Sequence, residues 1–158
     1  MEKWLVFLIV FAALGSGLIA GVFFAFSSFV MQALGRLPAA EGLRAMQAIN
    51  VAVINPAFFA AFFGTAIISL VLLGIAVLQW NERGAAYLLC GTLLYLVGSI
   101  GVTLLFNVPL NQALAATDAR SADSGRIWLH YQMQWTRWNH VRAFAALISC
   151  ALFIHPLW

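Results

Sequence analysis

Charged residues are scarce in this chain: only 8% of its 158 residues are Asp, Glu, Lys or Arg, whereas 64% are apolar. Soluble domains are usually about 25% charged and roughly 45–50% apolar. So few polar side chains cannot cover a surface that faces water, which excludes a soluble enzyme and a disordered chain. The eight basic residues form no phosphate-binding patch, so no nucleic-acid partner is expected.

Cysteine and metal-ligand patterns are also lacking. Cys90 and Cys150 both fall in apolar runs and predict no disulfide framework. His130 and His140 are too far apart for a pair of ligands on one helix, and no acidic residue lies inside an apolar run. No zinc or haem spacing occurs, so the sequence predicts no metal site.

What the chain has instead is long apolar runs. Four of them, at residues 4–31, 57–80, 85–106 and 139–158, reach or approach the roughly 20 residues that a helix needs to span a bilayer. Lipid-exposed backbone must satisfy its own hydrogen bonds, so each run is expected to be helical. The sequence therefore predicts an all-α integral membrane protein, a single domain over residues 1–158 folded as a four-helix bundle.

The connections between the runs are unequal. Residues 81–84 make a tight turn, whereas residues 36–56 and 107–138 are long. Apolar spacing predicts helices over residues 43–53 and 127–138, and we expect these two helical connections to cap one face of the bundle. That side carries six arginines, against Lys3 and Arg83 on the other. The excess places the long connections in the cytoplasm, with the protein in the inner (plasma) membrane of a bacterium.

Small residues recur at every fourth position of the first run, at Ala13, Gly17, Gly21 and Ala25. Such a stripe lets another helix backbone approach closely. Tight packing within the bundle is one interpretation, and homodimerisation through Gly17 and Gly21 is the alternative.

The polar trio Asn139, His140 and Arg142 opens the fourth run. Only 16 residues follow Arg142, about 24 Å of helix against a hydrocarbon core of roughly 30 Å. We therefore expect the trio at the membrane edge, facing the bundle interior as part of a functional site. Aromatic residues precede it at helical spacing and would stack on one helix face, although an interfacial aromatic belt is the alternative. They are Trp128, Tyr131, Trp135 and Trp138.

Asparagines lie near both expected helix breaks. Pro56 marks the start of the second span, and Pro109, which biases Val108 out of the helical region, is expected to end the third. Asn residues beside prolines can satisfy freed backbone groups. They can also converge into a polar pocket roofed by aromatics. The residues concerned are Asn50, Asn55, Asn107, Asn111 and Asn139, all toward one membrane face.

Several of these stretches resemble one family. Residues 23–31 (Phe-Phe-Ala-Phe-Ser-Ser-Phe-Val-Met), the pair Asn55-Pro56, residues 106–111 (Phe-Asn-Val-Pro-Leu-Asn) and the motif Trp135-x-x-Trp138-Asn139-His140-Val-Arg142 resemble the anthrone-oxygenase-like family of small membrane proteins. Many members are known only as a domain of unknown function. The resemblance covers essentially the whole chain and implies a four-helix membrane protein. In fungal members it implies oxidation of an anthrone to an anthraquinone by O2, with no known metal or organic cofactor.

The chemistry that this resemblance implies assigns a role to each candidate residue. His140 is the expected base, because histidine exchanges protons near neutral pH. Arg142, Asn139 and Asn107 are candidate donors to a developing enolate oxygen. The expected substrate-binding residues include Trp135 and Trp138, which would stack on a flat polycyclic ring. The others are Tyr131, Asn111, Asn55 and Asn50.

Two functions from different classes follow. The first is a cofactor-independent oxygenase in the lipid bilayer, whose partners are O2 and a lipophilic anthrone-like or phenolic polycyclic compound. The second is a non-catalytic membrane protein that binds or exports a lipid or hydrophobic small molecule. The trio that includes His140 and Arg142 favours chemistry, and the absence of a carboxylate within a span disfavours proton-coupled transport.

Overall fold

The computed structural model describes residues 2–157, which form helices joined by turns, with no strand in that part of the chain. Four helical segments are long and apolar enough to cross a membrane: Lys3–Gly35, Pro56–Leu78, Ala85–Ala115 and Ser124–Leu157. The all-α fold expected from the apolar runs is confirmed. The outward faces of these segments expose large apolar side chains, such as Phe7, Leu18 and Leu105, as a surface in contact with lipid would.

Two of the four segments are composite. The first runs from α1 (Lys3–Ala25) through the π-helical η1 (Phe26–Val30) into α2 (Met31–Gly35). The third consists of α5 (Ala85–Leu93), the π-helical η2 (Leu94–Gly101) and η3 (Thr103–Asn107), and α6 (Val108–Ala115). The second segment is α4 (Pro56–Leu78), and the fourth is α7 (Ser124–Ile154) with the short 3-10 turn η4 (His155–Leu157).

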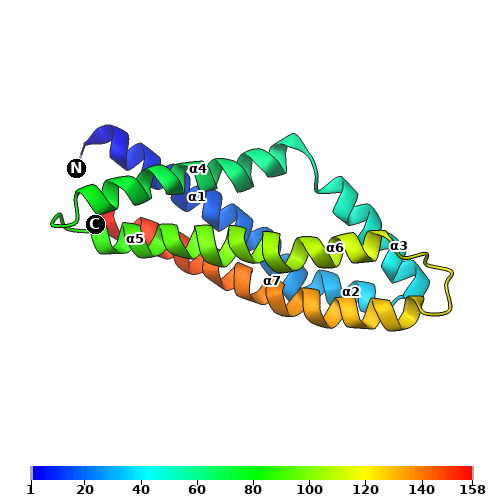
Figure 1. Ribbon diagram of the computed structural model, residues 1–158. Helices are drawn as coiled ribbons and strands as arrows, with labels where there is room; N and C mark the ends of the chain where they lie inside the picture. Colours follow the sequence, from blue (N-terminus) through cyan, green and yellow to red (C-terminus); the bar gives the residue numbers. More distant parts are fainter. Residues whose placement is uncertain (1, 158) are drawn as a thin grey trace.

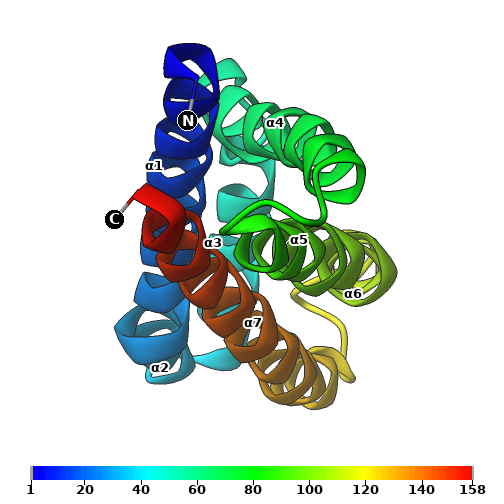
Figure 2. The same cartoon turned by 90° about the vertical axis from the view of Figure 1, so that its left-hand side faces the viewer.

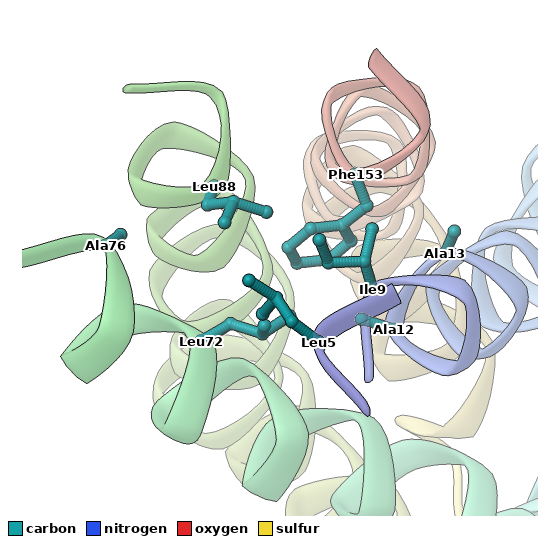
Figure 3. Close-up of a cluster of buried hydrophobic side chains, with 8 residues drawn as sticks. All are labelled: Leu5, Ile9, Ala12, Ala13, Leu72, Ala76, Leu88 and Phe153. Carbon is teal, nitrogen blue, oxygen red and sulfur yellow. The ribbon is translucent and has the colours of Figure 1, made fainter. Parts of the chain in front are cut away.

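The four segments lie side by side along one axis, and α1 begins at the same end of the molecule as α7 finishes (Figure 1). Seen from that end, α7 lies between α1 and α5, and α4 lies across the bundle from α7 (Figure 2). An apolar cluster at this end draws on all four segments. Leu5, Ile9, Leu72, Leu88 and Phe153 point toward one another there (Figure 3). Close packing of this kind holds helices together in lipid.

A fifth helix, α3 (Ala39–Ala52), covers the opposite end. It packs against α6 and α7 and buries Leu43 and Met46 beside Trp128 and Leu114. The helix expected near residues 43–53 is therefore confirmed as a cap on one end. Residues 127–138 are helical as well, but they belong to α7 and run without a break into the fourth span. The expected helix over residues 127–138 is therefore confirmed, and Trp128, Tyr131 and Trp135 pack with α3 at this end. Only the start of the fourth span differs from the expected Asn139, because no Gly or Pro interrupts residues 126–155.

Pro56 and Pro109, the prolines at the two expected helix breaks, behave differently. Asn55 is extended (φ −138°, ψ 158°), and its side chain accepts a hydrogen bond from the Phe58 backbone N–H at 3.0 Å, so the expected break before α4 is confirmed. Val108 is helical (φ −64°, ψ −46°), and the third segment continues to Ala115. The expected break at Pro109 was wrong. Pro109 lies in the first turn of α6, directly after the wide π-helical turns of η3, where a missing N–H is tolerated.

Candidate functional site

A buried arginine is the centre of the polar interior. Only 6% of the surface of Arg142 is exposed. Its Nε donates to Asn139 Oδ1 at 2.9 Å, and its Nη1 donates to Thr103 Oγ1 at 3.2 Å. The guanidinium carbon lies 4.0 Å from the ring centre of Phe23 and 4.8 Å from that of Trp135. The positive charge therefore rests between two aromatic faces and two neutral oxygens.

No carboxylate accompanies this charge. Within residues 2–157, the one ion pair joins Arg126 and Asp123 at the surface. The acidic residues Glu2, Glu41, Glu82, Asp118 and Asp123 are all exposed. Buried charges are normally paired with an opposite charge. Across the described residues Arg142 has no such partner, so its surroundings suit an anion.

Asn139 connects this arginine to the first segment. Its side chain is fully buried, and Nδ2 donates to the Phe23 carbonyl and to Ser27 Oγ, both at 2.7 Å. Together with the bond that it accepts from Arg142, these contacts tie α7 to the end of α1 and to η1. Because Ser27 Oγ accepts from Asn139, its own proton is free to be donated elsewhere.

A second group of polar residues lies around Trp135. The Tyr131 hydroxyl donates to Asn111 Oδ1 at 2.9 Å and accepts a long bond of 3.5 Å from Asn50 Nδ2. Tyr131 stacks on Trp135, with 6.1 Å between ring centres, and Asn107 Nδ2 donates to the Trp135 carbonyl at 3.2 Å. Asn107 Oδ1 and Trp135 Nε1 are buried without a hydrogen-bond partner, which is uncommon in folded proteins.

Most of the candidate residues from the sequence belong to these two groups. The contact between Arg142 and Trp135 joins the groups. They are Asn50, Asn107, Asn111, Tyr131, Trp135, Asn139 and Arg142. Three others lie apart from both groups: Asn55, Trp138 and His140. Asn55 is exposed and caps α4, which is the backbone-satisfying alternative. Trp138 stacks face to face on Phe106, at 3.7 Å and 9°, so a neighbouring side chain covers one of its two ring faces.

His140 is separated from Arg142. It is exposed on the outer side of α7, whereas Asn139 and Arg142 are buried. Residues two positions apart on an α-helix point about 200° away from each other. The expectation that the whole trio faces the interior is therefore correct for Asn139 and Arg142 and wrong for His140.

His140 lies instead on a groove of about 440 Å³ between the first and fourth segments. Small and apolar residues form most of its lining: Gly17, Ala20, Gly21, Phe24, Ala143, Phe144 and Leu147. Its polar side chains are His140, Ser27 and Ser28, and the Ser28 hydroxyl donates to the Phe24 carbonyl of its own helix at 2.7 Å. Ser27 therefore belongs both to the groove and to the hydrogen-bonded chain that leads to Arg142.

A larger hollow, of about 750 Å³, lies at the opposite end of the molecule beside Glu2, Glu82 and Arg83. It contains none of the candidate residues. Within residues 2–157, no three His, Cys, Asp or Glu side chains gather as a metal-binding group would.

Three residues of the site were missed by sequence reasoning: Phe23, Ser27 and Thr103. Ser27 lies in η1 and Thr103 in η3. The wider turn of a π-helix changes which side of a helix its residues face, and such turns are frequent at functional sites. The run at residues 23–31 that carries the family resemblance contains Phe23 and Ser27 and was an available signal, whereas Thr103 lies in no such run.

Fold and site together define a helical membrane protein with a polar interior around an unpaired arginine. The family model for anthrone oxygenase matches residues 56–152, which is more than half of the chain, so the protein belongs to the anthrone oxygenase family. The matched region runs from the start of α4 into the last turns of α7 and includes Asn107, Asn139 and Arg142. No curated protein and no solved structure matches the chain.

Proposed function

We propose that this protein is a membrane-embedded oxygenase that oxidises an activated methylene group of a lipophilic, anthrone-like or phenolic polycyclic compound with O2. One observation carries the proposal. Hydrogen bonds run from Arg142 through Asn139 to Ser27, and Ser27 lies on the same apolar groove as His140. Membership of the anthrone oxygenase family supports the class of reaction.

The first step is removal of a proton from carbon. The methylene group of an anthrone is flanked by two aromatic rings and conjugated with a carbonyl, so its loss of a proton gives an enolate. His140 accepts that proton, and Ser27 donates a hydrogen bond to the carbonyl oxygen as negative charge develops. Arg142 strengthens this donation through Asn139, because electrostatic interactions are strong where water is excluded.

The second step needs no catalyst for oxygen itself. The electron-rich carbanion transfers an electron to O2, and the two radicals combine to form a C–O bond and a peroxide anion. Protonated His140 returns its proton to that peroxide. The remaining methylene hydrogen then leaves as a proton while the O–O bond breaks and hydroxide departs. The balance is CH2 + O2 → C=O + H2O, and His140 is restored.

The groove suits such a substrate. Its volume lies within the roughly 300–1,000 Å³ typical of small-molecule sites. Phe24 and Phe144 line it from α1 and α7, and both are 64% exposed, so a flat ring arriving from the bilayer meets aromatic faces. In this proposal Trp135 and Tyr131 support Arg142 from behind rather than contact the substrate.

Anthrone oxidation by the purified protein in detergent micelles tests the proposal. We expect quinone absorbance to rise under air at a rate proportional to the concentration of wild-type protein. Under nitrogen the absorbance should not change. Empty micelles measure spontaneous oxidation. A rate in air no higher with protein than with empty micelles would contradict the proposal and favour a binding or export role.

We also infer that the end with α3 and the long connections faces the cytoplasm of a bacterial inner membrane. Arg142 is buried and carries no topological information, but the arginines that remain on this side are all exposed: Arg36, Arg44, Arg120, Arg126 and Arg137. Lys3 and Arg83 are their exposed counterparts at the other end. A cysteine placed at Gln79 should react with an impermeant maleimide added to intact cells, and one placed at Ala122 should not. The reverse pattern would overturn the orientation.

A further inference from the structure

The charge of Arg142 is uncompensated from every side. Around the hydrogen-bonded chain, α1 provides the Phe23 carbonyl, η1 provides Ser27 and η3 provides Thr103. The amides of Asn50 and Asn111 come from α3 and α6. The titratable groups nearby are Tyr131 and His140 on α7 and Tyr95 on η2. Tyr131 donates its hydroxyl proton to Asn111 and Tyr95 donates its own to the Phe62 carbonyl, so both are neutral, and a histidine is neutral or positive. Within residues 2–157, no nearby group supplies the negative charge that a buried guanidinium requires.

We propose that the groove binds planar phenols and enols as their oxyanions, with Arg142 supplying the compensating charge through Asn139 and Ser27. This inference rests on the proposed function for the place of the site. It goes further by naming the bound form of the ligand, which is a flat, lipophilic, acidic phenol or enol that gives up its proton on binding.

The arrangement of the groove sets the position of the oxyanion. The Ser27 hydroxyl proton is free, whereas that of Ser28 is bonded within its own helix. An oxygen bound at Ser27 lies roughly 8–10 Å from the guanidinium, three hydrogen bonds and one amide away. At an effective dielectric constant of about 20, the charge then favours the ionised phenol by roughly 15- to 35-fold. The ionisation midpoint of the bound phenol should fall by about 1.2 to 1.5 pH units.

The floor of the groove distinguishes a ligand from a second copy of the chain. A Cβ atom added at Gly21 would meet nothing within 4 Å, so this floor is open. A partner helix packed there would place apolar side chains over His140 and Ser27 and leave their polar atoms without partners. A lipid acyl chain in the groove would also leave the polar atoms of His140 and Ser27 without partners, whereas a phenolate can form hydrogen bonds with both.

The test uses 2-hydroxyanthraquinone, whose visible absorbance changes when it ionises, and its methyl ether. We expect the wild-type protein in micelles to bind the phenol more tightly than the ether and to lower the ionisation midpoint of the phenol by about 1.2 to 1.5 pH units relative to empty micelles. Arg142→Gln should abolish the shift. Arg137→Gln removes an exposed arginine of the same helix and should leave it unchanged.

Further variants keep the proposal falsifiable if Arg142→Gln fails to fold. Ser27→Ala leaves the charge in place but removes the donor that holds the oxyanion close to it, and should reduce the shift. His140→Asn should retain it. Gly21→Leu should block binding, while Gly74→Leu, at an equally open position on α4, should not.

Each other outcome overturns the proposal: no binding by the wild type, equal binding of phenol and ether without a shift, a shift that follows His140, or a dimer that Gly21→Leu dissociates. Anthrone turnover is measured separately. A protein that ionises the dye but does not oxidise an anthrone contradicts the proposed oxygenase function alone.

Discussion

Replacing Ser27 by alanine tests the link between the buried charge and the groove. Removing one donor to a developing oxyanion typically lowers kcat by about 10²–10³-fold, and we expect a loss of that size. Stability should change little, because Asn139 Nδ2 keeps its 2.7 Å bond to the Phe23 carbonyl. The bond that is lost is worth about 0.6 kcal/mol in a typical membrane protein.

The assay is the initial rate of quinone formation from an anthrone under air, at several anthrone concentrations. Ser28→Ala is the comparison, since it removes the neighbouring hydroxyl, which is bonded to the Phe24 carbonyl of its own helix. We expect a much smaller effect from it. If both variants lower kcat equally, or if Ser27→Ala raises only KM, Ser27 does not act on the transition state.

A double-mutant cycle makes the same test sharper. If Arg142 acts on the substrate through Ser27, then Arg142→Gln should cost little further activity once Ser27 is alanine, because both changes remove one electrostatic effect. Multiplicative losses in the double variant would mean that the arginine acts by another route.

Three further predictions concern other parts of the site and the packing. His140→Ala should lower turnover by about 10²–10⁴-fold, the usual cost of losing a general base, whereas His155→Ala, which removes a ring that follows the last turn of α7 and stacks on Tyr87 at 3.7 Å, should not. Asn139→Ala should lower the free energy of unfolding by about 2 kcal/mol in a denaturation series in micelles, because two hydrogen bonds from α7 to the first segment and one to Arg142 of the same helix are lost, each worth about 0.6 kcal/mol or somewhat more; an unchanged midpoint would contradict this. Gly98→Ala should also destabilise, because the added Cβ would lie 2.6 Å from that of Ala145 on α7, while Gly64→Ala meets nothing within 4 Å and should be neutral.

The apolar runs were sufficient to predict the fold, since lipid admits few structures other than helices. They misplaced the ends of two segments. The polar stretch before Asn139 reads as a connection, yet without Gly or Pro it continues α7. Pro109 reads as a terminator, yet it follows the wide turns of η3 and falls where α6 begins. Hydropathy reports the surroundings of a helix, and not how far its hydrogen bonding continues.

The site could be predicted only in part. Asn139 and Arg142 are three residues apart and share a helix face, whereas His140 does not. Helical geometry alone could have separated it from the trio. Ser27 lies in the run at residues 23–31 that carries the family resemblance, but hydroxyls in apolar helices commonly bond to their own backbone. Ser16, Ser28 and Thr65 do so here, and Ser28 lies in the same run, so the run did not single out Ser27.

The absence of a carboxylate beside Arg142 has a cost and a consequence. A buried guanidinium is destabilising by several kcal/mol unless its surroundings replace water, and here two ring faces and two neutral oxygens do so. An aspartate in place of Asn139 would compensate the charge better, but it would also cancel the field that reaches Ser27. Neutral acceptors hold the arginine in position and leave its charge available to an anion, which is the balance that enolate chemistry in a membrane requires.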